Sequence, residues 1–163
     1  MTQADMFLRI DGTRQGAIKG EARDAGHKDE IDVFAWRWGM EGNQLHGAAT
    51  TKTTVRELTV VKRVDKASTA LMSALRSNEV IKKATLMVRK AGGPDAVEYY
   101  TITMEKARIT ALHQFSGDGG DPTVLTEELS IAFSKFGVDY KPQGDDGQFR
   151  GGTAFEMDVF EGE

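Results

Sequence analysis

The chain has 163 residues, a formal charge of −4 and no cysteine. This length can bury a core without disulfides or a structural metal, and the lack of cysteine excludes a disulfide framework, a thiolate zinc site and a cysteine nucleophile. No run approaches 18 apolar residues, and residues 1–10 carry acid and base inside their apolar stretch, so we expect neither a membrane-spanning segment nor a Sec-type signal peptide. Scattered rather than clustered lysine and arginine argue against nucleic acid as the main partner.

Apolar and polar residues alternate through most of the chain, which is typical of half-buried strands. The first strand is predicted around Met6, Leu8 and Ile10. Further strands are expected near 29–39, 55–64, 85–89, 97–112, 124–140 and 154–160, separated by loops rich in Gly, Asp and Pro. We therefore predict a mainly β protein that forms one domain over residues 1–163.

Two of these strands are long, and the alternation in each slips by one residue. In 97–112 the apolar set moves from Tyr100, Ile102 and Met104 to Ala107, Ile109 and Ala111. The same slip separates Leu129, Ile131 and Phe133 from Phe136, Val138 and Tyr140. Such a slip indicates either a bulge or a change of the surface that the strand covers. Long strands that bend in this way suit a closed or nearly closed barrel.

One segment, residues 66–78, has helical rather than strand periodicity. Its apolar residues recur at the spacing of one helix face, at Ala67, Ala70, Leu71, Ala74 and Leu75. Asp65 or Ser68 is available to cap the amino end. A short amphipathic helix of this kind is expected to cover part of the sheet.

The sequence contains no convincing active site. The three histidines, His27, His46 and His113, lack the spacing of metal ligands and are expected to lie at the surface or in turns. The acidic loops at 118–121 and 145–147 lack the twelve-residue calcium pattern, so solvated turns are the better interpretation. No G-x-S-x-G elbow occurs. We therefore expect no enzyme activity, no metal and no cofactor, and look for function in surfaces.

The segment Ile31–Gly39 would be costly at the surface of a monomer. Alternation places Asp32, Phe34, Trp36 and Trp38 on one side and Ile31, Val33, Ala35 and Arg37 on the other, so both sides are partly apolar. Such a strand is buried twice, either inside a two-layer core or between the core and a neighbouring subunit. The long strand within 123–140 would also invite edge pairing, which cyclic self-assembly would use as an interface.

These residues carry a resemblance to a known family. The matching pieces run in order along the chain and comprise Asp5–Gly12, Ile18–Glu21, His27–Val33, Trp36-x-Trp38-Gly-Met40, Val64–Ser68, Leu86–Gly93, Leu125–Glu127 and Val138–Pro142. The pair of Trp-x-Trp-Gly-Met and Val-Arg-Lys-Ala-Gly-Gly at this separation is the most specific signal. On these motifs the chain resembles haemolysin-coregulated proteins (Hcp), the tube subunits of bacterial type VI secretion.

The resemblance implies an antiparallel β-barrel with one short flanking α-helix that forms homohexameric rings. Stacked rings would make the inner tube of a contractile injector, binding and exporting effector proteins in the lumen. The implied partners are other copies of the chain, a spike protein at the tube tip, the surrounding contractile sheath, the baseplate and the effectors. The protein would be cytoplasmic during assembly and then secreted without a cleavable signal peptide.

The resemblance also suggests where the functional residues lie. Arg37, between the two tryptophans, is expected to face the lumen, and alternation gives Ala35 and Val33 the same side. Trp36 and Trp38 are expected to pack in the barrel. Leu45 and His46 are predicted at the tip of a ring-stacking loop. Two other interpretations stay open: a phage-type tail tube protein and a monomeric secreted β-barrel binding module.

Overall fold

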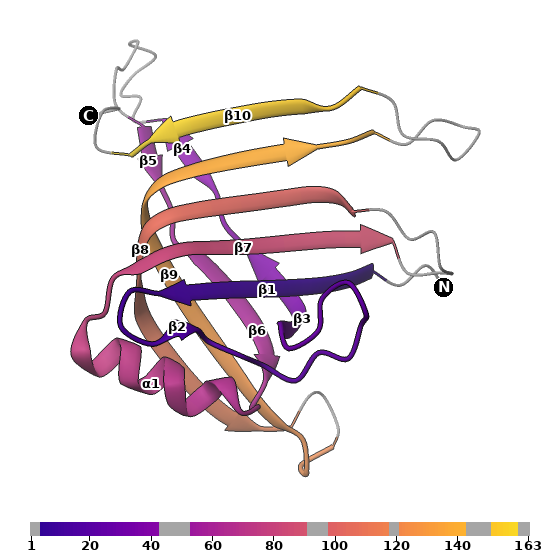
Figure 1. Cartoon of the computed structure of the whole chain (residues 1–163), viewed down its shortest axis with the longest axis vertical. Coiled ribbons are helices and arrows are strands. Elements are labelled where there is room, and N and C mark those ends of the chain that lie inside the picture. Colours follow the sequence, from indigo (N-terminus) through magenta and orange to yellow (C-terminus); the bar gives the residue numbers. More distant parts are fainter. Residues whose placement is uncertain (1–3, 43–52, 91–97, 118–120, 143–150, 160–163) are drawn as a thin grey trace.

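The computed structural model describes residues 4–42, 53–90, 98–117, 121–142 and 151–159, which form ten strands and one helix (Figure 1). The elements are β1 (Ala4–Gly12), β2 (Gly16–Ala17), β3 (Ile31–Arg37), β4 (Met40–Gly42), β5 (Thr53–Val55), β6 (Leu58–Arg63), α1 (Ala67–Ser77), β7 (Ile81–Lys90), β8 (Glu98–Ser116), β9 (Leu125–Tyr140) and β10 (Thr153–Asp158). The predicted helix and the strands expected from alternation are all present, with ends that differ by a few residues. Within this part of the chain no helix is long and apolar enough to cross a membrane.

Six antiparallel strands close into a barrel in the order β9-β6-β3-β1-β7-β8, because β8 pairs back onto β9. Figure 1 shows one layer made of β1, β7, β10 and the adjoining halves of β8 and β9. Behind it, β3, β6 and the other halves of β8 and β9 cross at a steep angle. The prediction of an antiparallel β-barrel with one short helix is confirmed.

The slips of alternation in the two long strands lie at the corner where both strands bend. Met104 and Ala107 are both buried in β8, and Lys106 between them takes a positive φ of 49°. Across the corner, the Ser134 hydroxyl of β9 donates a hydrogen bond of 3.1 Å to the Lys106 carbonyl. The irregular residue lets the apolar side chains of β8 stay in the core on both sides of the slip. The register between β8 and β9 does not shift here, because Glu105 pairs with Lys135 and Ala107 with Phe133, so the apolar set is restored without the inserted residue of a β-bulge.

Helix α1 covers the barrel on the side away from β10 (Figure 1). Leu71 and Ala74 are buried on its inner face. At its start, an Asp65 carboxylate oxygen accepts the Ala67 N–H at 3.0 Å, and the Ser68 hydroxyl accepts the Asp65 N–H at 3.0 Å. The N-cap residue itself is Lys66, which makes no side-chain cap hydrogen bond. Neither predicted residue is therefore the N-cap, although both satisfy backbone donors next to it. Asn78 ends the helix in the left-handed conformation, with a φ of 54°.

A buried ion pair ties this helix to the barrel wall. Lys62 of β6 and Glu127 of β9 are fully buried and opposite each other in the register. The Lys62 ammonium donates to Glu127 at 2.6 Å and to Asp65 at 3.0 Å. The Ser68 hydroxyl donates to the same Glu127 oxygen at 2.6 Å. Each buried charge is thus paired and hydrogen-bonded, as burial requires.

A second buried carboxylate, Glu79, holds the turn between β1 and β2. One oxygen of Glu79 accepts the backbone N–H groups of Arg14 and Gln15, each at 3.0 Å. Burial acts to raise the pKa of Glu79, but the hydrogen bonds from Gln15 and Arg14 outweigh it, so the pKa lies below its ordinary value. The turn therefore gains stability from an ionised Glu79.

Candidate functional site

The side chains on the outer face of β3, β6, β9 and β8 form two rows across four paired strands. Arg37, Thr59, Ser130 and Ala111 are aligned in one row, and Ala35, Val61, Glu128 and His113 in the next. Their chain neighbours in β6 and β9 fill the core, so these side chains point away from it. We call these eight residues the outer wall face. Most are small or polar, and all are exposed or half-buried.

A β-bulge in β3 decides which of its side chains belong to this face. Val33 pairs with Lys62, but Ala35 pairs with Val61, so Phe34 is an extra residue without a partner in β6. Val33 is only 6% exposed and belongs to the core. The prediction that Val33 shares a side with Arg37 is therefore wrong, because the bulge turns the strand between them. Ala35 and Arg37 are both exposed, on the outer wall face.

The two tryptophans follow the bulge on the core side of the strand. The Trp36 ring stacks on Tyr100 with centroids 5.5 Å apart, and the Trp38 ring meets the edge of Phe136 at 5.0 Å. Both pack against the hydrophobic core. Their predicted place in the barrel is confirmed, and it anchors the backbone on both sides of Arg37.

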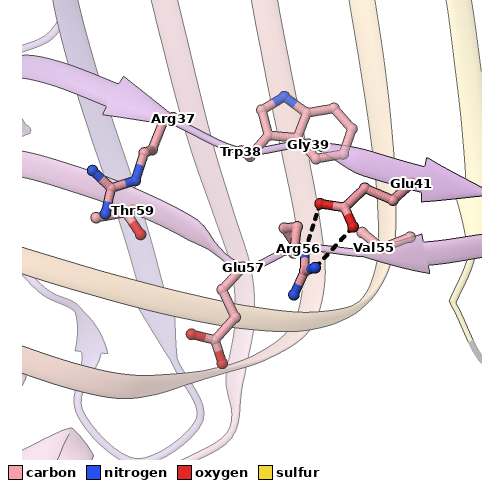
Figure 2. Close-up of a pocket in the computed structure, with 8 residues that line it drawn as sticks. All are labelled: Arg37, Trp38, Gly39, Glu41, Val55, Arg56, Glu57 and Thr59. Carbon is pink, nitrogen blue, oxygen red and sulfur yellow. Dashed lines mark hydrogen bonds and ion pairs between the residues drawn. The ribbon is translucent and has the colours of Figure 1, made fainter.

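An open depression of about 610 Å³ lies at the end of this strand (Figure 2). It is lined by Arg37, Trp38, Gly39, Glu41, Val55, Arg56, Glu57 and Thr59. Glu41 of β4 and Val55 of β5 form part of the wall of this depression. These two strands pair as a two-stranded ribbon between the strands expected near 29–39 and 55–64, where the sequence predicted only a loop. We call it the Arg37 pocket.

Four ionic side chains line the pocket, namely Arg37, Glu41, Arg56 and Glu57, and two of them bind each other. Arg56 donates two hydrogen bonds to the carboxylate of Glu41, at 3.0 and 2.8 Å. These bonds and the charge of Arg56 lower the pKa of Glu41. Glu57 accepts a hydrogen bond of 2.9 Å from the Thr110 hydroxyl. No signal in the sequence points to this arrangement, since it depends on how β4 and β5 pair.

Arg37 is the least engaged of the four. Its guanidinium extends away from the Glu41–Arg56 pair in Figure 2. Its side chain is 77% exposed, and its ion-pair contact among the described residues is with Glu128 at 3.9 Å. That distance is too long for a hydrogen bond. The pocket therefore presents one guanidinium, at the end of strand β3, that no other described residue holds at hydrogen-bond distance.

Comparison with known proteins identifies the family. The family described as the type VI secretion system effector Hcp matches residues 7–140. The protein Hcp1 of Pseudomonas aeruginosa is 39% identical over 152 residues, which cover 91% of this chain and 90% of that protein. The chain belongs to the Hcp family of type VI secretion proteins. A second Pseudomonas aeruginosa protein, named major exported protein, is 27% identical over 71% of this chain and 74% of its own length.

Solved structures of Hcp proteins share the whole fold. The crystal structure of Hcp1 from Salmonella typhimurium has a TM-score of 0.75 and 30% identity, covering 99% of this chain and 97% of that one. A structure of a type six secretion system protein has a TM-score of 0.85 at 21% identity and covers 99% of both chains. The barrel with its flanking helix is thus the fold of the Hcp family.

Other residues singled out by the sequence lie elsewhere. Leu45 and His46, predicted for ring stacking, lie outside the described residues, as do the acidic residues at 145–147. His27 lies in a turn, one of the two kinds of position expected for the histidines, and is buried there. Its ring stacks on Phe7 at 4.3 Å, and its nitrogens lie 3.0 Å from Glu30 and 2.6 Å from Glu98. His27 therefore packs a loop against the barrel.

The described residues show no arrangement of three or more histidine, aspartate or glutamate side chains that could hold a metal. At the acidic loop near 118–121, the described residue Asp121 accepts hydrogen bonds from the backbone and hydroxyl of Thr123, at 2.9 and 2.6 Å. These bonds lower the pKa of Asp121. Asp121 thus stabilises a local turn, whereas residues 118–120 of this acidic loop lie outside the described residues.

Proposed function

We propose that this chain is a structural subunit of the type VI secretion inner tube and has no catalytic role. Six copies form a ring, rings stack into a conduit, and effector proteins bind and travel in the lumen. The tube carries a spike protein at its tip and lies within a contractile sheath on a baseplate. The chain is cytoplasmic during assembly and is then exported with the tube.

The observation that carries this proposal is the pair of open strand edges beside the outer wall face. Along 34–37, β3 pairs with β6 but with no other described strand. Along 108–116, β8 pairs with β9 alone among the described strands. Within the described part of the chain, the four-stranded wall therefore ends on each side in an edge that pairs with no further strand. Unpaired edges are templates for pairing with another chain.

Pairing the β3 edge of one copy with the β8 edge of the next is a head-to-tail contact. Such contacts generate a ring when the rotation closes. The outer wall faces of six copies then line the hole, which places Arg37 and Ala35 toward the lumen. A ring of six chains of charge −4 carries −24, so like charge opposes non-specific association. Bound cargo stabilises the loaded ring by mass action.

Native mass spectrometry and negative-stain electron microscopy of the purified chain test the assembly. We expect hexamers and ring-shaped particles with a central hole, and an interface of at least about 1,000 Å² between neighbouring copies. A monomer at every accessible protein concentration, with no rings on the grid, would refute the tube proposal.

A further inference from the structure

The Arg37 pocket holds charged groups of unequal availability. Glu41 and Arg56 satisfy each other through two hydrogen bonds of 3.0 and 2.8 Å. Glu57 is held by the Thr110 hydroxyl at 2.9 Å. Arg37 has the 3.9 Å contact with Glu128 and is otherwise open to solvent, with 77% of its side chain exposed. A ligand of negative charge therefore meets one guanidinium that forms no hydrogen bond with another described residue.

The chemistry around Arg37 suits a carboxylate. A guanidinium presents parallel N–H donors that match the two oxygens of a carboxylate. Thr59 lies opposite Arg37 in the register, and its hydroxyl is 3.5 Å from that of Ser130. These two hydroxyls extend the row of donors beside the guanidinium. The backbone of Arg37 is held between two packed tryptophans, so the group is presented from a fixed strand rather than a loop.

We infer that the Arg37 pocket binds carboxylate groups of the cargo, and that the ring selects cargo with acidic segments on its surface. This inference rests on the proposed function, because the ring brings six such pockets around one lumen. A single exposed contact of this kind is weak, but six identical contacts act together on one cargo molecule. Weak individual contacts also let the cargo exchange between pockets as it moves.

A fluorescein-labelled hexaglutamate peptide serves as the probe, with binding followed by fluorescence anisotropy at low ionic strength. We expect the native protein to bind it, and the Arg37→Gln variant to bind about fivefold or more weakly. Arg37→Lys keeps the charge but loses the planar pair of donors, so it should fall between the two. Arg9→Gln is the matched control, since Arg9 is an exposed arginine of β1 that pairs with Asp11 at 3.2 Å.

Native mass spectrometry of the same samples separates the two proposals. If the variant forms rings but binds hexaglutamate as tightly as the native ring, the carboxylate site is refuted and the tube stands. If the chain is monomeric and Arg37→Gln still abolishes binding, the pocket is correct and the tube is refuted. Tighter binding of labelled hexalysine than of hexaglutamate would also overturn the inference, because Glu57 would then be the recognising group. Unchanged thermal unfolding shows that each variant is folded.

Discussion

Replacing Lys62 by methionine removes the cation from a buried ion pair while keeping most of the side-chain volume. Glu127 is then left fully buried, without the ammonium that lies 2.6 Å away in the native protein. Removing one partner of a buried pair typically costs about 3–5 kcal/mol, because the other charge stays in a poorly solvated site. The Ser68 hydroxyl still donates to Glu127 at 2.6 Å, which favours the lower end of that range. We expect a loss of about 3 kcal/mol for Lys62→Met.

The double variant Lys62→Met, Glu127→Leu is the matched control. It removes both charges and fills the space with apolar side chains, a replacement that is often neutral or stabilising. We expect it to recover most of the stability that the single variant loses. The comparison separates the cost of an unpaired charge from the cost of disturbing the packing between β6 and β9.

Urea unfolding at one fixed protein concentration measures both variants, since self-association raises the apparent stability. A loss of about 3 kcal/mol corresponds to a fall in Tm of about 6–12 °C for a chain of this size. A single variant that unfolds within about 0.5 kcal/mol of the native chain would refute the reasoning. A double variant no more stable than the single one would show that Lys62 acts through packing rather than charge.

Two further predictions concern the loops. A Cβ at Gly20 would lie 2.6 Å from the Glu30 carbonyl oxygen and 2.9 Å from the Ile31 Cα. Gly20→Ala should therefore lower the free energy of unfolding in urea by about 1–3 kcal/mol. Gly39→Ala is the control and should cause no such loss, because a Cβ at Gly39 would meet nothing within 4 Å. The lowered pKa of Glu79 stabilises the fold fully above the ordinary value of 4.5, and this stabilisation is lost as the pH falls through the folded value. The urea midpoint of Glu79→Gln should therefore change less than the native midpoint between about pH 5 and pH 2, and parallel curves would contradict this.

Local periodicity predicts the helix and strands of this fold well, because the apolar residues of each element recur on the one face that packs against the core. Leu129 and Ile131 of β9 alternate toward the core, and Leu71 and Ala74 of α1 line one helical face. The slip of alternation in β8 and β9 even locates the corner of the barrel. Such features depend on residues close together in sequence, and the tertiary structure reinforces them.

Contacts that depend on strand register could not be predicted in the same way. Lys62 continues the inward positions of Leu58 and Val60, and Glu127 occupies the equivalent position in its own strand. Each charge alone suggests a surface position. Only the antiparallel register sets Lys62 and Glu127 opposite each other, so that the two buried charges form one ion pair. The Arg37 pocket was missed for the same reason, since it needs the pairing of β4 with β5.

The bulge at Phe34 is a feature of register that decides which side chains of β3 reach the candidate site. An uninterrupted β3 would continue the register that sets Val33 opposite Lys62, and would bring Arg37 opposite Leu58, a fully buried residue. Residues opposite each other share a face, so an arginine would then enter the core and Trp36 would turn outward. The extra residue shifts the register by one and sets Arg37 opposite Thr59. Because Phe34 is itself apolar, alternation alone conceals the insertion, although it places both the tryptophans and the arginine where the proposed function needs them.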